Sequence, residues 1–131
     1  MPYNGAAIKE IFEQLKTSIS PDLVLTHYRD DAHQDHRLLS ELTRNTYRDH
    51  IVLEYEIPKY DGDLGQPNFF VPLDLTTCNA KVEHLMSAFE SQKMKRWFQK
   101  ETFFGLMRLR GMECNSPSGY AEAFYAHKIS L

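Results

Sequence analysis

The chain has 131 residues, of which 42% are hydrophobic, and its formal net charge is -3. This length suits a single domain over residues 1–131, and the slight acidity gives no reason to expect nucleic acid or an anionic membrane as a partner. The two cysteines lie far apart, and no stretch has the features of a signal peptide or the length of a membrane span. We therefore expect a cytoplasmic protein without a disulfide framework.

Apolar residues recur at helical spacing near the N-terminus, which predicts an amphipathic helix over residues 5–18. The apolar face of this helix consists of Ile8, Ile11, Phe12 and Leu15. Ser20 and Pro21 then end the helix. Residues 23–26 form a short apolar run, which is typical of a strand in a parallel sheet that is covered on both faces.

A second helix is predicted from an N-cap at Asp35 to about Tyr47. Its inner face is expected to hold Leu38, Leu39, Leu42 and Thr46. Residues 51–57 then alternate as a strand, with Ile51, Leu53, Tyr55 and Ile57 on one face. Because Glu54 and Glu56 share the other face, we expect that face to be partly wet or to belong to a site.

The loop over residues 58–68 is rich in glycine, proline and acidic or amide residues, which excludes a regular element. Loops of this kind often form rims or lids of sites. The sequence next predicts a short strand over residues 69–73, which Pro72 indicates is weakly paired or at an edge. A helix capped by Thr76 or Thr77 is predicted to run to Phe89. The inner face of this helix is expected to hold Val82, Leu85, Met86 and Phe89. A last helix over 101–112 and extended chain over 120–131 complete the prediction.

The segment His33-Gln34-Asp35-His36 lies where the strand over residues 23–26 gives way to a helix. Ligands of open α/β sheets bind outside the carboxyl ends of strands. Neutral imidazole binds zinc, carboxylates orient such imidazoles, and histidine transfers protons near neutral pH. A short segment with this histidine spacing is more often a polar helix cap on the surface. A catalytic zinc usually has three protein ligands, and this cluster supplies only one or two.

Other titratable residues are weaker candidates. His27 is near enough to line the same pocket, although a strand-end histidine with satisfied hydrogen bonds is the commoner case. The acids Asp30, Asp31, Asp61 and Asp63 suit acid–base chemistry, but acids in such positions more often shape turns.

The strand and cluster resemble the second motif of the PIG-L/LmbE-like zinc-dependent deacetylases. The matching residues are Pro21 to Thr26 and Asp31-Ala32-His33-Gln34-Asp35-His36-Arg37. Residues 53–64 are similar to bacterial members that we associate with sugar and polysaccharide metabolism. Arg110-Gly111 and the run from Tyr120 to Phe124 look like the family's C-terminal signature. The resemblance covers nearly the whole chain, in the right order.

This resemblance implies an α/β fold with a Rossmann-like, mostly parallel sheet flanked by helices. It implies hydrolysis of an N-acetyl group of an amino sugar or glycoconjugate, such as an N-acetylglucosamine unit. His36 would be a zinc ligand, His33 would polarise the reaction centre or protonate the leaving amine, and Asp35 would orient a histidine. Zinc would act as a Lewis acid and lower the pKa of its bound water. His27, Tyr60 and Glu122 are further candidates for contacts with the substrate.

One departure from the family pattern is large. The family's first motif, His-Pro-Asp-Asp-Glu, supplies two more metal ligands and the general base, and the sequence contains no such motif. The chain therefore resembles the C-terminal half of a deacetylase, a partial domain, and whether it is an enzyme stays open. We expect weak or no zinc binding by this chain alone.

The same departure has a structural consequence. Without the family's first strand, residues 23–26 would present an unpaired edge and an uncovered apolar face. We therefore expect a homo-oligomer, or pairing with a separate N-terminal half.

Two functions fit these observations. The first is a metal-dependent N-deacetylase, or half of one. The second is a non-catalytic remnant that binds a sugar or a protein partner. A two-metal phosphoesterase fits less well, because the sequence has no second acid-rich metal cluster.

Overall fold

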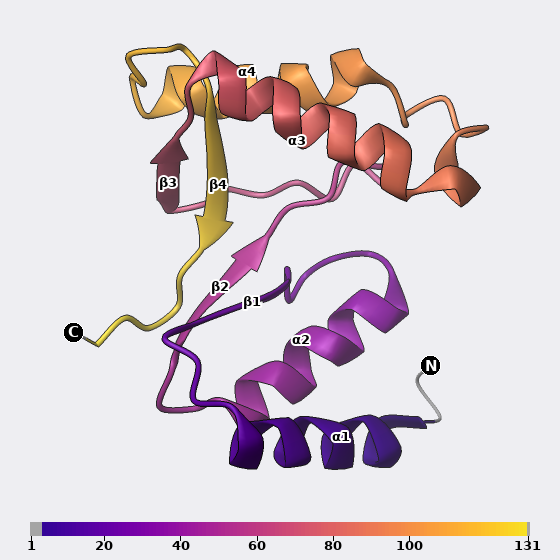
Figure 1. Ribbon diagram of the computed structural model, residues 1–131, viewed down its shortest axis with the longest axis vertical. Coiled ribbons are helices and arrows are strands. Elements are labelled where there is room, and N and C mark those ends of the chain that lie inside the picture. Colours follow the sequence, from indigo (N-terminus) through magenta and orange to yellow (C-terminus); the bar gives the residue numbers. More distant parts are fainter. Residues whose placement is uncertain (1–3, 131) are drawn as a thin grey trace. The chain divides into compact units, whose positions relative to one another are not determined.

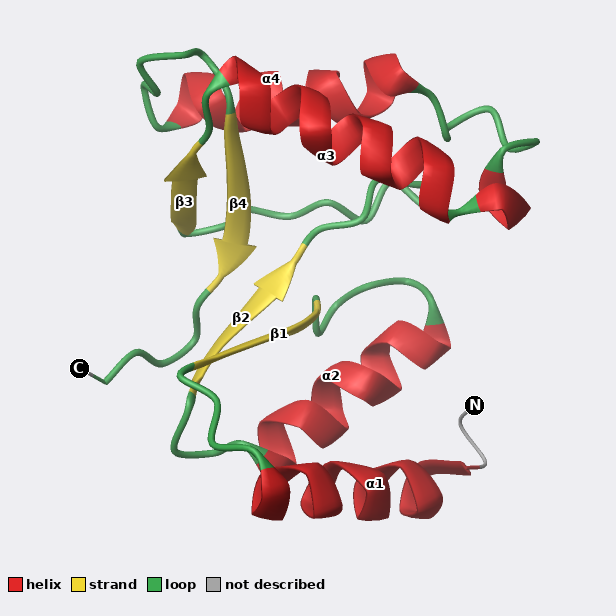
Figure 2. Ribbon diagram, in the orientation of Figure 1, coloured by secondary structure: helices red, strands yellow, loops and turns green. Residues whose placement is uncertain are grey.

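The computed structural model of the protein describes residues 4–130, which form two compact units. Of these residues, unit 1 holds 4–57, 63–65 and 124–130, and unit 2 holds 58–62 and 66–123. Each unit combines helices with strands (Figures 1 and 2).

Unit 1 consists of two helices and a small sheet. Its elements are α1 (Gly5–Ser18), β1 (Leu23–His27), α2 (Gln34–Thr46), β2 (Ile51–Tyr55) and the end of β4 (Ala121–Tyr125). β1 and β2 pair in parallel, with Thr26 beside Glu54 and His27 beside Tyr55. Phe124 and Tyr125 of β4 pair antiparallel with β2. The predicted helix over 5–18 is confirmed, and the two predicted strands lie within two residues of their expected ends.

The two faces of β1 differ, because successive residues of a strand point to opposite sides. The hydroxyl of Thr26 lies 3.1 Å from that of Thr43, so α2 covers the face that carries Thr26. Leu23 and Leu25 point to the other face and are 48% and 53% exposed. Within the described residues, β1 is also an edge strand, because only β2 pairs with it. The predicted unpaired edge and uncovered apolar face are thus confirmed for this part of the chain.

The helix faces of unit 1 differ from the prediction. α1 lies against α2, but Ile11 and Leu15 are exposed and no described residue of α1 is fully buried. In α2, Thr46 is buried as predicted, but the predicted inner leucines are only partly buried and Ser40 and Thr43 are buried instead. The helix packs on the sheet through a polar layer, in which the hydroxyls of Thr26 and Thr43 meet. The Thr43 hydroxyl also donates a hydrogen bond to the Leu39 carbonyl at 2.6 Å.

Unit 2 holds β3 (Phe69–Pro72), α3 (Leu75–Ala88), a short 3₁₀ helix (Glu90–Gln92), α4 (Lys100–Glu113) and the start of β4. Asp74, rather than Thr76 or Thr77, caps α3, because its Oδ1 accepts a hydrogen bond from the Thr77 N–H at 2.7 Å. Hydrogen bonding by the Thr77 side chain, and then by the Thr77 backbone N–H, holds the pKa of the Asp74 carboxyl below its ordinary value.

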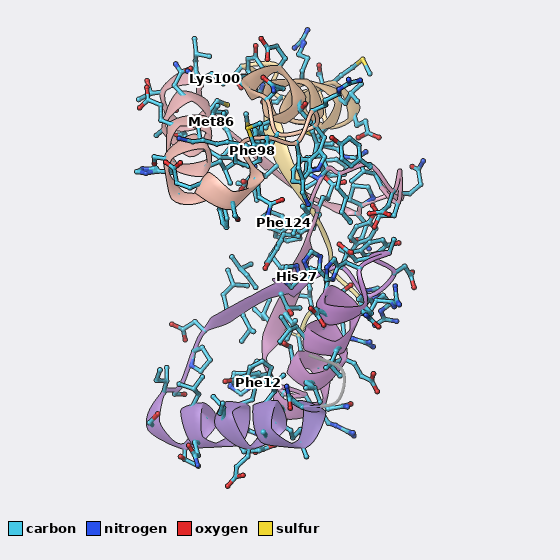
Figure 3. All side chains as sticks on the ribbon, turned by 90° about the vertical axis from the view of Figure 1, so that its right-hand side faces the viewer. Phe12, His27, Met86, Phe98, Lys100 and Phe124 are labelled. Atoms are coloured by element: carbon cyan, nitrogen blue, oxygen red, sulfur yellow. The ribbon has the colours of Figure 1, made fainter. Side chains whose placement is uncertain are left out.

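The core of unit 2 is an aromatic and aliphatic cluster between α3 and α4. Its buried members are Cys78, Val82, Phe98, Phe103 and Met107, and Leu85 and Met86 pack against them (Figure 3). The predicted inner face of α3 is therefore right except for Phe89, which is 50% exposed because it lies beyond the last turn of the helix.

The strand order β1-β2-β4-β3 places β3 at the other end of the sheet, as Pro72 predicts. The sheet is mixed, since β1–β2 is parallel and β2–β4 is antiparallel. The predicted α/β class is confirmed. Within residues 4–130, no helix combines the length and the apolar character that a membrane crossing requires.

Met107 allows a matched test of the unit 2 core. Met107→Ala should destabilise unit 2 by about 3 kcal/mol, because it empties a fully packed site. Met112→Ala removes the same side chain from a 65% exposed position on α4 and should cost less than about 0.5 kcal/mol. Denaturant unfolding followed by fluorescence of Trp97, which packs against this cluster, measures both values. Equal effects of the two substitutions would contradict this description of the core.

Candidate functional site

The predicted cluster lies at the carboxyl end of β1, where residues 28–33 connect that strand to α2. In open α/β sheets, this is the position at which ligands bind. Figure 3 shows His27 at this end of β1, close to the start of α2. Strand end, loop and first helical turn all belong to unit 1.

His33 caps α2, which corrects the prediction that Asp35 is the N-cap. The Nδ1 atom of His33 accepts a hydrogen bond from the backbone N–H of Asp35 at 3.2 Å. A nitrogen that accepts this bond carries no proton, so neutral His33 has its proton on Nε2. The main chain of Asp35 therefore orients His33, and the exposed imidazole presents a donor.

Three imidazole rings form a stack at this site. The rings of His27 and His36 are parallel within 4°, with centroids 3.9 Å apart, and His33 stacks on His36 with centroids 4.5 Å apart. Tyr55 lies on the neighbouring strand β2, and its hydroxyl is 3.4 Å from His27 Nε2. The structure thus brings the rings of His27, His33 and His36 together at the carboxyl end of β1.

Asp31 is the residue of this site that sequence reasoning undervalued. Its side chain is nearly fully buried, and Oδ1 accepts the backbone N–H of His33 at 2.8 Å. Its Oδ2 lies 3.1 Å from His36 Nδ1, at ion-pair distance but without the alignment of a hydrogen bond. A carboxylate beside Nδ1 favours the proton on that nitrogen and leaves Nε2 of His36 as the free lone pair. The signal in the sequence was an acid two residues before His33.

The loop that carries these histidines is held from two sides. The Arg37 guanidinium donates to the carbonyl oxygens of Asp31 and Ala32, at 2.9 and 2.7 Å. The Asp63 carboxylate accepts the backbone N–H of Ala32 at 2.6 Å. Residues 63–65 of the loop over 58–68 belong to unit 1. From there, Asp63 helps to fix the loop between β1 and α2.

A pair of stacked tyrosines lies beside the loop. Tyr28 and Tyr125 stack with centroids 3.9 Å apart, and the Tyr125 hydroxyl accepts the Gly65 N–H at 2.9 Å. A Cβ atom at Gly65 would lie 2.7 Å from the Tyr125 hydroxyl, so glycine allows this close approach. Burial first, and then the neighbouring Tyr28, raise the pKa of Tyr125 well above its ordinary value.

The remaining candidates lie in unit 2. The Tyr60 hydroxyl accepts the backbone N–H of Arg96 at 2.7 Å, and the Tyr60 side chain is otherwise largely exposed. Glu122 forms an ion pair with Lys81 at 2.6 Å. A role of either residue in binding substrate stays a prediction.

The residues present do not by themselves fit a catalytic zinc site. Within residues 4–130, no group of three or more histidine, cysteine, aspartate or glutamate side chains is arranged to hold a metal ion. Catalytic zinc sites usually have three protein ligands. His36 offers one suitable nitrogen, and further ligands would have to come from outside the described residues.

No family model matches the sequence, and no curated protein matches it. The solved structures that are similar in fold include the following two. The first is GalB, the 4-carboxy-2-hydroxymuconate hydratase of Pseudomonas putida KT2440, with a TM-score of 0.65 and 16% identity over 100% of this chain and 60% of that one. The second is Dbv21, the A40926 pseudoaglycone deacetylase, with a TM-score of 0.63 and 20% identity over 93% of this chain and 55% of that one.

The likeness shows that this chain shares a mixed α/β fold with both solved structures. The chain spans little more than half the length of each neighbour. Identities of 16% and 20% carry no activity with them, and the two neighbours are named for different reactions.

Three tyrosines of unit 1, one buried and two partly buried, predict a loss of stability at alkaline pH. The pKa values of Tyr28, Tyr55 and Tyr125 are all raised above 10.0, so the folded state keeps protons that the unfolded state loses. Their contribution is complete below pH 10 and declines as the pH rises further. Tyr125→Phe should flatten this decline and should cost about 1 kcal/mol at neutral pH, because the Gly65 N–H loses its acceptor. Unfolding curves at neutral and alkaline pH test this, and equal pH dependence in both proteins would contradict it.

Proposed function

We propose that this chain contributes part of the active site of a hydrolase that removes N-acetyl groups from amino sugars. The observation that carries the proposal is the stack of His27, His36 and His33 at the carboxyl end of β1. The similar fold of a named deacetylase supports it. In this proposal, an N-acetylglucosamine unit or a related glycoconjugate is the substrate.

His33 is the proposed proton donor in this site. Hydrolysis of an amide expels an amine, which leaves readily only when it receives a proton. His33 is exposed and carries its neutral-state proton on Nε2, because Nδ1 accepts the Asp35 N–H. To protonate the amine, His33 must be in its imidazolium form, which gives up the Nε2 proton as the carbon–nitrogen bond breaks and returns to neutral imidazole.

His36 is the proposed metal ligand, with Asp31 behind it. Asp31 beside Nδ1 leaves Nε2 of His36 free to bind a divalent ion such as zinc. Since the described residues do not complete a zinc site, the other ligands and the general base would come from another polypeptide segment or chain.

The longest natural polypeptide that contains this sequence should release acetate from N-acetylglucosamine derivatives when zinc is present. His33→Gln should lower the rate of release roughly a hundredfold or more, because it removes the general acid. His84→Gln, an exposed position on α3 of unit 2, serves as the matched control and should leave the rate unchanged. If that polypeptide released no acetate from any acetamido sugar, the proposal would be wrong.

A non-catalytic sugar- or partner-binding module is the second candidate. It is favoured by the absence of a three-ligand group within residues 4–130. Metal analysis separates the two candidates, because near-stoichiometric zinc that depends on His36 would argue against a remnant.

We also propose that a second copy of the chain covers the open face of β1. An unpaired strand edge offers backbone hydrogen-bonding groups to another strand, and Leu23 and Leu25 lie beside this edge. Pairing of two β1 edges about a two-fold axis would cover both copies at once.

Leu25→Lys should shift the protein toward monomer in sedimentation experiments, because it places a charge on this face. Leu109→Lys changes a residue of unit 2 with similar exposure, 54% against 53%, and should not change the mass. A wild-type protein that is monomeric at all concentrations would contradict this proposal.

A further inference from the structure

A cavity of about 330 Å³ in unit 1 is lined by residues of β2, α2 and the C-terminal segment. Six basic side chains line it, namely Arg29, Arg44, Arg48, His50, His127 and Lys128. Among the described residues that line the cavity, Glu54 is the single acid. With the histidines neutral, four cations and one carboxylate give the lining a net charge of +3, in a chain whose overall charge is -3.

The Glu54 carboxylate lies 3.0 Å from His127 Nε2 and at ion-pair distance from the inner nitrogens of two arginines. The Glu54 side chain is fully buried, and Oε2 lies 3.8 Å from Arg29 Nε and 3.9 Å from Arg44 Nε. Within the described residues, the terminal nitrogens of these two guanidinium groups have no hydrogen bond or ion pair. Both side chains are about one-third exposed, at 34% and 35%, so these nitrogens remain available to a ligand.

Arg48 and Lys128 add charge that no acid of the described chain neutralises. The Lys128 ammonium donates to the backbone carbonyl of Arg48 at 2.7 Å, and this bond joins the C-terminal segment to the turn after α2. The Arg48 guanidinium has no partner among residues 4–130. One buried carboxylate needs one positive charge, so a purely structural ion-pair network would leave the other cations unexplained.

We propose that this cavity binds the phosphate group of a small soluble phosphate ester. Guanidinium groups stay charged at every physiological pH, and their planar forks match the oxygens of phosphate. A doubly charged phosphate would neutralise most of the surplus charge. A water molecule takes up about 30 Å³, so the cavity has room for the phosphate and several more non-hydrogen atoms of the ester.

This site is distinct from the histidine stack. Glu54 and Tyr55 are consecutive in β2 and therefore point to opposite faces of the sheet. Tyr55 lies against His27, whereas Glu54 faces the cavity. The anion site does not rest on the proposed deacetylase function, since phosphate binding can be measured without any acetate release.

Isothermal titration calorimetry of the whole chain with inorganic phosphate, glucose 6-phosphate and glucose tests the proposal. We expect the two phosphates to bind and glucose not to bind. Arg48→Gln should weaken binding of both phosphates about tenfold, because a charge-assisted hydrogen bond is lost. Arg48 does not contact Glu54, so this variant should remain folded, which circular dichroism checks.

Arg96→Gln is the matched control, because it removes the same charge from an exposed position in unit 2. It should bind both phosphates with wild-type affinity. The proposal is overturned if neither phosphate binds, if glucose binds as well as its phosphate, if Arg48→Gln binds like wild type, or if both substitutions weaken binding equally.

Discussion

The buried carboxylate of Glu54 is the interaction on which unit 1 depends. Its Oε1 accepts the Arg29 N–H at 2.7 Å, and Oε2 lies 3.0 Å from His127 Nε2 and 3.9 Å from Arg44 Nε. These partners come from the loop after β1, from the segment after β4 and from α2. A charge removed from water is costly unless it is paired, so these segments must converge on Glu54 when unit 1 folds.

This constraint gives unit 1 two chemically different sides. On the face of Tyr55, three imidazoles stack beside Asp31, and neutral histidine suits proton transfer or metal binding. On the face of Glu54, permanent cations line a cavity. A hydratase and a deacetylase both have folds similar to this one. The side chains at the site, and not the fold, therefore decide the chemistry.

The sequence predicted elements that depend on local pattern and missed features that depend on distant partners. The periodicity of the first helix placed α1 at Gly5–Ser18, and Pro72 placed β3 at an edge. The resemblance brought His33 and His36 to one site. The burial of Glu54 could not be read from its strand, because its partners lie 25 residues before it and beyond the end of β4. The contact between Thr26 and Thr43 could not be predicted either, because these residues are 17 positions apart and nearby leucines fitted the helical pattern better.

Hydrogen exchange of the β1 and β2 amides in a Glu54→Gln variant tests the central claim most directly. The substitution keeps the shape of the side chain and removes its charge, which leaves the partly buried cations around it without their counter-charge. Because the cations are about one-third exposed, we take the low end of the cost of breaking a buried pair, about 3 kcal/mol, which corresponds to exchange about a hundredfold faster. Glu83→Gln, on the exposed side of α3 in unit 2, should leave this exchange unchanged. Wild-type protection of β1 and β2 in Glu54→Gln would contradict the claim that this carboxylate holds unit 1 together.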